Sequence, residues 1–504
     1  MKKHYNMELE ALQKSGPKPS IPLGEQNKAI LRQEFMVFLM NVGLFAGGIA
    51  LALPAVTLNQ LTNPAEDVYL DKNQASWFAS CSQLACPLGG ILCALMVDKY
   101  GRKNTTIVTN IIAVLAWALM AFPMKGRGSN FVFLQLIASR VMSGIVKGMG
   151  GTATACYGTE ICLPRIRARL IMAVTMAMAS GVLFIYILGY FIRDNWRLLG
   201  MVLLGYQIIC LICLIPVKES PVWLMSKGRT EEAKDSLSFF RGLRSGETHK
   251  EVEAEFIEMT KNAEMEIDKA KTSFWEFLTR PEFYKPLMLS IVFYILQQFA
   301  GTFIVLVYAV QILTNSGLHI DPYLYAIYMG IARFVVASFI MTWELETWTR
   351  RQVGIFSAIS MSFCMFLLAA SNWCPWLQMS YLPVAVVIGV VIFGAGLWAV
   401  PFVVCMEIFP QNIRGPCSGL TDGFVYFMSF VTIKLFPTMV DEMGSGNTFM
   451  FYGITAIVTA VFIYMCIPET KGKTLHEIEE YFSSKRKKEP KMEEMTELVV
   501  KIKP

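Results

Sequence analysis

The sequence predicts an all-α membrane protein with twelve transmembrane helices in two pseudo-symmetric halves of six. Apolar residues make up 54% of the chain and charged residues 17%, well below the quarter or so of charged residues in a typical soluble domain. Twelve apolar stretches come close to the roughly 20 residues that a helix needs to cross a bilayer. A set of charged residues recurs after about 250 residues, which indicates two related halves.

The twelve spans divide evenly between the halves. Those of the first half lie at about 35–56, 76–97, 105–124, 131–151, 170–191 and 196–216. Those of the second half lie at about 287–312, 323–343, 353–370, 382–405, 417–437 and 449–467. We expect a cytoplasmic N-terminal tail at 1–30, the two halves at 31–217 and 286–470, a cytoplasmic helical linker at 218–285 and a charged cytoplasmic tail at 471–504.

The recurring charges lie just after corresponding spans of the two halves. They are Glu160 and Arg167 with Glu407 and Arg414, Glu219 with Glu469, and, as a weaker copy, Asp98, Arg102 and Lys103 with Glu346, Arg350 and Arg351. Two related halves that are otherwise mostly apolar are typical of a secondary transporter.

Lysine and arginine residues gather in the loops after the second and fourth spans and in the matching loops of the second half. The positive-inside rule makes these loops cytoplasmic, and both termini with them. The loop between the first two spans carries Glu66, Asp67 and Asp71 against Lys72, which agrees with an outside location. The net charge of +6 is therefore a topology signal and does not indicate a nucleic-acid-binding patch.

Motifs for enzyme chemistry and metal binding are absent from the sequence. Gly472-Lys473-Thr474 lacks the glycine that a Walker A loop carries five residues before Gly472. The four histidines lie outside the spans and apart from one another, and the twelve cysteines show no paired spacing on the outer loops. We therefore expect no enzymatic activity, no metal site and no cofactor.

Six motifs, in register over nearly the whole chain, resemble the sugar porter family of the major facilitator superfamily. They are Asp98-Lys-Tyr-Gly-Arg-Lys, Glu160 to Arg167, Lys218-Glu-Ser-Pro-Val-Trp-Leu, Gln297-Gln-Phe-Ala-Gly, Glu407-Ile-Phe-Pro to Arg414, and Pro468-Glu-Thr-Lys-Gly. The later spans look most like those of insect facilitated trehalose and hexose transporters. The resemblance implies a major facilitator fold, a plasma-membrane location and facilitative transport of a sugar by alternating access.

The resemblance also implies gating residues. Tyr308 resembles an outer-gate tyrosine, and the loop charges resemble an inner lock made of Asp98, Arg102, Lys103, Glu160, Arg167, Glu219, Glu407, Arg414 and Glu469. Charges at helix ends can pair across the two halves when the inner mouth closes and must separate when it opens, so they bias an equilibrium between two states. The alternative is that they serve only as topology signals and helix caps. Arg140, in the fourth span, is expected to pair within the bundle.

The substrate site is expected around Gln297 and Gln298 in the seventh span. Two adjacent glutamines in an apolar helix cost free energy without partners, so we expect one to face a water-filled cavity; hydrogen bonding between helices is the alternative. Alignment on the family motifs adds five substrate-binding positions: Thr175, Phe303, Arg333, Phe402 and Tyr426. Several are less polar than the family's residues, which predicts a cavity more apolar than a typical hexose site.

Three ionisable residues lie within spans: Lys147 in the fourth, Arg333 in the eighth and Asp422 in the eleventh. Groups of this kind usually face a cavity or a partner. The two cations could bind an anionic substrate, or Arg333 and Asp422 could pair. The first span has no carboxylate where proton-coupled sugar porters carry an aspartate, which favours a uniporter, although Asp422 could carry a proton.

Two other functions remain open. The same fold could transport an organic anion or another small molecule, as the cations and aromatic replacements suggest. The chain could also be a nutrient sensor that transports little; this ranks last, because sensors of the family have long cytoplasmic tails and here about 34 residues follow Thr470. The partners expected are a small-molecule substrate and the lipid bilayer, with no nucleic acid, and the sequence does not predict the oligomeric state.

Overall fold

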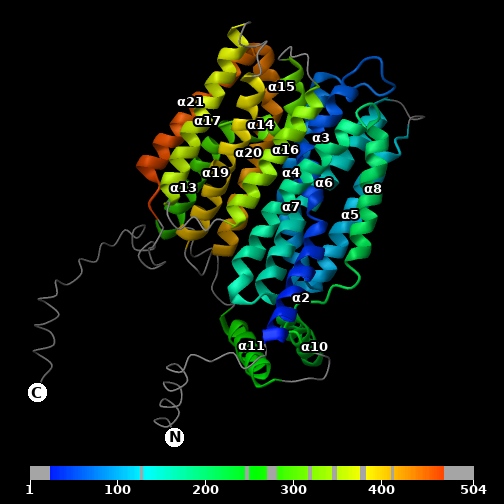
Figure 1. The fold of residues 1–504 in the computed structure, drawn as a ribbon, viewed down its shortest axis with the longest axis vertical. Helices are drawn as coiled ribbons and strands as arrows, with labels where there is room; N and C mark the ends of the chain where they lie inside the picture. Colours follow the sequence, from blue (N-terminus) through cyan, green and yellow to red (C-terminus); the bar gives the residue numbers. More distant parts are fainter. Residues whose placement is uncertain are drawn as a thin grey trace, which may run out of the picture.

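The computed structural model describes residues 23–124, 129–243, 249–269, 281–315, 321–342, 349–374, 382–409 and 414–469. Within these ranges every regular element is an α-helix (Figure 1), as the composition predicted. The predicted tails lie largely outside the described residues, at 1–22 and 470–504. Arg167 and Arg414 lie on described helices, but their side chains are outside the description, as is Glu346.

The helices follow the predicted order. The first group is α2 (Leu23–Val42), α3 (Phe45–Leu61), α4 (Lys72–Tyr100), α5 (Arg102–Ala121), α6 (Ser129–Ile161), α7 (Pro164–Phe191) and α8 (Trp196–Cys213). Short helices follow at α9 (Pro221–Ser226), α10 (Thr230–Phe240) and α11 (Lys250–Lys269). The second group is α13 (Pro281–Phe299), α14 (Thr302–Val307), α15 (Ala309–Asn315), α16 (Pro322–Thr342), α17 (Arg350–Trp373), α19 (Leu382–Ile408), α20 (Arg414–Met443) and α21 (Ser445–Cys466).

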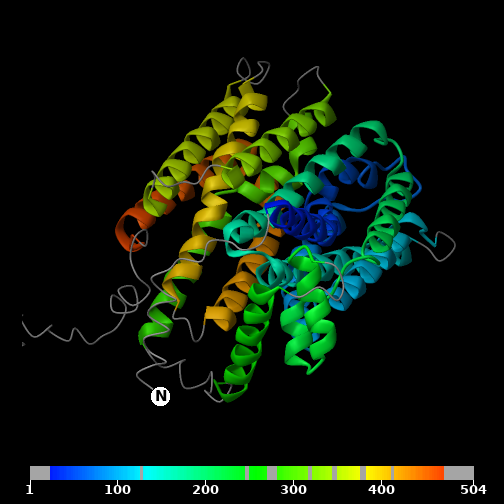
Figure 2. The same ribbon diagram turned by 60° about the horizontal axis from the view of Figure 1, so that its bottom comes forward.

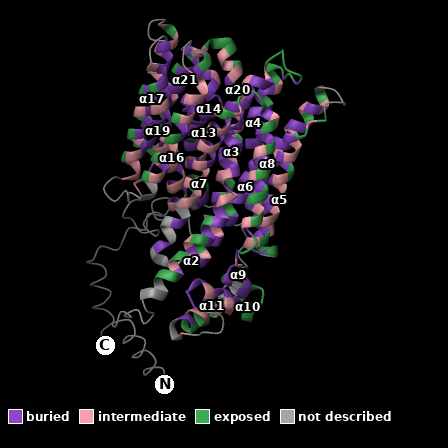
Figure 3. Cartoon of the chain, turned by 45° about the vertical axis from the view of Figure 1, so that its right-hand side comes forward, coloured by how far each residue is buried: buried purple, intermediate pink, exposed green. Residues whose placement is uncertain are grey.

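Eleven helical segments of the described residues are long and apolar enough to cross a membrane. The seventh predicted span is not among them because it is divided into α13, α14 and α15. Adding this interrupted span gives the twelve that were predicted. Large apolar side chains such as Leu95, Ile212 and Met465 are exposed on the outside of the bundle, where lipid would cover them (Figure 3).

The first span is longer than predicted and runs from Asn27 to Leu61 with a short turn after Val42. Its polar extension is held by the helices that follow α8. Arg32 donates to the carbonyls of Phe239 and Leu243, at 3.0 and 2.9 Å. The Gln33 amide donates to the Phe240 carbonyl at 2.8 Å. Helix α2 therefore begins before the apolar stretch, because contacts with the helices after α8 hold its polar residues in place of lipid.

Helices α9–α11 lie beneath one end of the bundle, which we call the linker end; the opposite end is the far end (Figure 1). Figure 2 brings the linker end forward and shows these green helices beside the blue and cyan helices of the first group. Arg241, at the end of α10, contacts both α11 and α6. Its Nη2 lies 2.5 Å from a Glu255 carboxylate oxygen of α11, and its Nη1 lies 3.1 Å from the Ile161 carbonyl of α6. The helices after α8 thus dock on the first group of spans.

Close packing between neighbouring spans depends on glycine. On α6, a Cβ atom at Gly144 or Gly148 would lie 2.1 or 2.0 Å from the carbonyl oxygens of Ser82 or Cys86 on α4. Any larger residue would therefore force the two helices apart. Small residues at such interfaces let helix backbones approach in a membrane, where no hydrophobic effect drives association.

The two groups of spans meet along two helix pairs, α7 with α16 and α4 with α20. Gly330 of α16 packs against Leu183 and Tyr186 of α7. A Cβ atom added at Gly330 would lie 3.0 Å from Leu183 and 3.1 Å from the Tyr186 ring. Tyr186 also donates its hydroxyl to the Leu306 carbonyl of α14 at 2.8 Å. On the other pair, Gly423 of α20 faces Pro87 of α4.

Arg140 joins three spans of the first group, as the prediction of pairing within the bundle required. Its guanidinium is 1% exposed and donates to the carbonyls of Ala50 on α3 and Phe78 on α4, at 2.7 and 2.9 Å, and to the Ser82 hydroxyl at 2.9 Å. The partners are backbone carbonyls and a hydroxyl, with no carboxylate among the described contacts. Arg140 is a structural residue.

We expect Arg140→Gln to destabilise the folded protein by about 3 kcal/mol or more, because several buried carbonyls lose their donors together. The measurement is the thermal unfolding midpoint in detergent, compared with Arg229→Gln, which removes an exposed cation paired to Glu232 and should change little. Equal midpoints for the two variants would show that Arg140 does not hold the spans together.

Candidate functional site

The interrupted seventh span brings polar side chains to the interior of the second group. Helix α13 ends at Phe299, and Gly301 follows with φ of +91°, a left-handed conformation that side chains strain. A Cβ here would also lie 3.0 Å from Met365 and 3.2 Å from Tyr452. The motif Gln297-Gln-Phe-Ala-Gly is therefore a helix end, with the two glutamines in the last turn before the break.

The two glutamine side chains are buried and only partly satisfied. The Gln297 amide donates to the Leu397 carbonyl of α19 at 3.4 Å, and the Gln298 amide donates to the Gln297 side-chain oxygen at 3.3 Å. The Gln298 side-chain oxygen is buried and has no hydrogen-bond partner. Gln297 thus bonds between helices, and Gln298 retains a buried acceptor that a hydroxyl-bearing ligand could fill.

An aromatic wall lies beside the glutamines. Phe303 meets Trp398 edge-on with ring centres 4.6 Å apart, and Trp398 lies 4.6 Å from Phe402. Phe402 in turn contacts Tyr294 at 5.7 Å. The sequence prediction included Phe303 and Phe402 and missed Trp398. Its spacing of four residues from Phe402 on one helix is the signal that could have revealed it.

The remaining predicted substrate positions are spread over both groups of spans. Thr175 is exposed on α7, and Arg333 is partly buried on α16. Tyr426 lies on α20, where its ring is 4.6 Å from the Lys147 ammonium of α6. Tyr308 is buried, donates its hydroxyl to the Ile433 carbonyl at 3.1 Å and stacks near Phe436. Tyr308 therefore joins α14 and α15 to α20 in this state.

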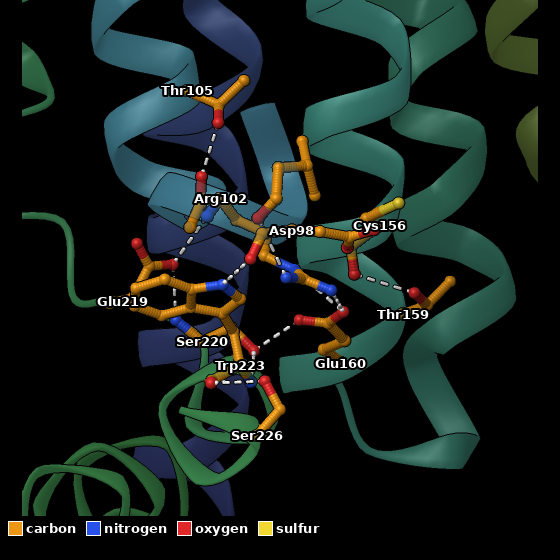
Figure 4. Close-up of polar contacts among 12 residues, drawn as sticks. Asp98, Arg102, Thr105, Cys156, Thr159, Glu160, Glu219, Ser220, Trp223 and Ser226 are labelled. Carbon is orange, nitrogen blue, oxygen red and sulfur yellow. Dashed lines mark hydrogen bonds and ion pairs between the residues drawn. The ribbon is translucent and has the colours of Figure 1, made fainter. Parts of the chain in front are cut away.

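Three of the predicted loop charges, Arg102, Glu160 and Glu219, lie together at the linker end of the first group (Figure 4). The Arg102 guanidinium reaches Glu160 at 2.6 Å, and the Ser220 hydroxyl donates to the other Glu160 oxygen. Glu219 accepts from the backbone N–H groups of Arg102 and Lys103, at 3.0 and 3.1 Å. A carboxylate here also stabilises the positive end of the α5 dipole.

Gly101 makes room for this network. Its φ is +94°, and a Cβ would lie 2.3 Å from the Glu219 carboxylate. The Trp223 indole donates to the Asp98 carbonyl at 3.0 Å, while the Asp98 side chain itself is exposed. The motif around Asp98 thus acts here through its backbone, and Lys103 points its ammonium to the Ile215 carbonyl at 3.0 Å.

The second group repeats the network in a looser form. Arg350 reaches Glu407 at 3.4 Å, and the Arg351 backbone N–H donates to Glu469 at 3.4 Å. Thr349 stands where the first copy has Gly101 and caps α17 by accepting from the Gln352 N–H at 3.2 Å. The sequence offset of about 250 residues is therefore a structural repeat, with longer contacts in the weaker copy.

At the far end, polar contacts cross between the two groups. Lys434 of α20 donates to the Asn73 side chain and the Ser76 hydroxyl of α4, both at 2.6 Å, and lies 4.7 Å from the Trp77 ring. The ion pairs Lys72–Asp441, at 3.0 Å, and Arg193–Asp321, at 2.6 Å, cross there as well. The ion pairs described at the linker end, by contrast, join residues of one group and its docked helices.

Sequence reasoning did not predict the Lys434 cluster. Lys434 lies near the end of the eleventh predicted span and has no counterpart in the charged repeat, so only the packing of α4 on α20 reveals its partners. Taken together, the geometry offers a polar and aromatic site beside a helix break, and charge networks at the two ends that differ in whether they cross between the groups. Such an arrangement can bind a small polar molecule and expose it to one side at a time.

Comparison with known proteins agrees with this arrangement. A family model described as sugar (and other) transporter matches residues 33–482. The facilitated trehalose transporter Tret1 of Polypedilum vanderplanki is 27% identical over 460 residues, covering 89% of this chain and 88% of that protein. A Tret1-2 homolog of Drosophila simulans is 28% identical, covering 87% of each. The inward open xylose transporter XylE from E. coli has a TM-score of 0.74 at 21% identity, over 88% of this chain and 98% of that one.

We expect Lys434→Met to loosen the far end, because two charge-assisted hydrogen bonds between the groups are lost, worth about 1–2 kcal/mol or roughly a tenfold shift in population. Spin labels on Tyr69 and Glu442, which are exposed at this end, should report a longer-distance population. Lys72→Met is the matched control, since its ion pair is 82% and 52% exposed and should contribute little. If the label distances stay as short as in the unaltered chain, Lys434 does not help to hold this end closed.

Proposed function

Because the chain belongs to the family of sugar and other transporters and has the major facilitator fold, we propose that it is a facilitative transporter that carries a sugar, trehalose or hexose, across the plasma membrane by alternating access. The linker end is the cytoplasmic end in this proposal, so that both termini lie inside the cell. The positive residues of the loops at this end support that orientation.

The observation that carries the proposal is the unfilled acceptor of Gln298 beside an aromatic wall at a helix break. Sugar hydroxyls need partners that replace their bonds to water, and sugar C–H faces pack on aromatic rings. Discontinuous helices are where transporters commonly place such sites. Relatives named facilitated trehalose transporters, aligned over most of both chains, support the same substrate class.

The aromatic side chains at the proposed site determine which sugar we expect it to prefer. With Phe303, Trp398 and Phe402 packed against one another, the site holds a sugar more by stacking than by dense hydrogen bonding. A ligand with a larger C–H surface, such as a disaccharide, gains more from such a wall than a monosaccharide does. We therefore propose trehalose ahead of glucose.

The direct test is uptake of radiolabelled trehalose and glucose into oocytes that express the chain, with and without a pH gradient. We expect uptake that saturates, is indifferent to the pH gradient and falls at least about tenfold in Gln298→Ala, because the amide loses its bonds to the sugar. Surface biotinylation controls for expression. Failure of both sugars to enter would reject the proposal, and uptake that follows the pH gradient would replace a uniporter with a proton-coupled carrier.

The charges at the linker end are proposed to set the balance between states. In the described state Arg102 neutralises Glu160 close to Glu219. We expect Arg102→Ala to reduce the transport rate at least about fivefold by shifting this balance, with ligand binding to purified protein changed less than about twofold. A loss of affinity as severe as that of Gln297→Ala would show that Arg102 acts in binding and not in gating.

A further inference from the structure

Two cations lie between the two groups of spans without a described carboxylate partner. Lys147 of α6 is 7% exposed and is surrounded by α3, α4 and α20. A Cβ atom added at Gly47 of α3 would lie 3.4 Å from its side-chain Cγ, and the Tyr426 ring of α20 covers its ammonium. The ammonium donates to the Gln83 side-chain oxygen at 2.8 Å. Because an ammonium has three donors, this hydrogen bond and the aromatic face leave donors unused.

Arg333 is the second cation. It lies one turn after Gly330, on the face of α16 that packs against Leu183 and Tyr186 of α7, so its side chain enters the interface between the groups. Its Nε is buried and has no hydrogen-bond partner. Both cations thus lie where helices of the two groups meet, Lys147 beside Tyr426 of α20 and Arg333 one turn from Gly330 on α16. Cations in a bundle interior are costly, which makes a functional site the default interpretation.

Arg140 shows what a purely structural cation looks like in this chain. It lies two turns before Lys147 on α6, and its donors reach carbonyls and a hydroxyl on the neighbouring helices. Arg333 has no such set among the residues that the structure describes. The packing therefore satisfies the buried guanidinium of Arg140 and leaves the buried Nε of the partly buried Arg333 without a partner.

Asp422 limits the charge that the site can accept. It lies one turn before Tyr426 on α20, with no ion pair among the described residues. Even when Asp422 is ionised, two cations against one carboxylate leave a positive charge uncompensated. A ligand with a single carboxylate neutralises that charge, whereas a doubly charged phosphate would exceed it.

These charges adjoin the proposed sugar site. Tyr294 lies one turn before Gln297 and Gln298 on α13, contacts Phe402 and is within electrostatic range of Asp422 and Tyr426. Tyr186, next to Arg333, bonds the backbone of α14 just after the helix break. A molecule bound at the glutamines could thus extend toward the cations.

From this geometry, and resting on the proposed function, we infer that the site includes a carboxylate subsite formed by Lys147 and Arg333, so that the chain also transports sugar acids, polyols with one carboxylate. The hydroxyls bind at Gln297 and Gln298, and the carboxylate accepts hydrogen bonds from the ammonium and the guanidinium. Charge-assisted bonds of this kind are about twice as strong as neutral ones, and a guanidinium can bind both carboxylate oxygens.

The test compares uptake of radiolabelled D-gluconate and D-glucose in the same oocytes, together with membrane current. We expect D-gluconate to enter, to compete with D-glucose and to carry one negative charge inward per molecule. Arg333→Gln and Lys147→Gln should each lower the ratio of D-gluconate uptake to D-glucose uptake at least about tenfold. Arg333→Lys should retain part of the D-gluconate uptake because it keeps the charge.

Arg229→Gln is the matched control, since it removes one positive charge from an exposed ion pair on the docked helices. If D-glucose enters while D-gluconate neither enters nor competes, the inference is wrong and the proposed function stands. The inference also fails if the two substitutions at the cations reduce both uptakes equally, because the cations would then only stabilise the bundle. If neither D-glucose, trehalose nor D-gluconate enters, the proposed function itself fails.

Discussion

The cost of holding charge away from water governs where this chain places its ionisable groups. Arg140 is tolerated because carbonyls of two neighbouring helices and a hydroxyl accept hydrogen bonds from its guanidinium. Arg102 lies at a helix end, where Glu160 pairs with it and the surface is near. Lys147 and Arg333 meet neither condition fully, and both lie where the two groups of spans face each other. The unsatisfied charges therefore lie in the region that moves and binds in the proposed function, whereas the satisfied ones lie within a single group of spans.

The backbone obeys the same constraint in the seventh span. A helix break leaves peptide groups without their usual partners, which is tolerated at membrane depth only inside a protein or beside a cavity. The break at Gly301 lies against Met365 and Tyr452 within the second group. Tyr186 of the other group donates to the Leu306 carbonyl in the last turn of α14, before the span is interrupted again. The interrupted span thus has partners from both groups. A shift of one group relative to the other would change those partners, which couples the site to the global motion.

The sequence predicted what depends on composition and spacing, and missed what depends on helix rotation. The twelve spans and the repeat of Arg102, Glu160 and Glu219 in the second half follow from hydropathy and from charges at helix ends, where side chains have few choices of partner. Trp398 was missed because an apolar helix offers no signal for which face turns inward. The Lys434 cluster was missed because its partners lie about 360 residues away, on a helix of the other group.

The two ends of the bundle are not equivalent, and the difference defines the state. Contacts between the groups at the far end must break before that end can open, whereas the ion pairs described at the linker end can persist because each stays within one group and its docked helices. The exposed pair Lys72–Asp441 contributes little to this barrier, since water screens both partners. The polar resistance then comes from the less exposed Arg193–Asp321 pair and from Lys434, whose ammonium is held by two side chains and an aromatic ring. In the proposed transport cycle, contacts across the far end that have no described counterpart across the linker end bias the equilibrium toward the state open to the docked helices. A ligand that reverses this balance must bind the opposite state more tightly.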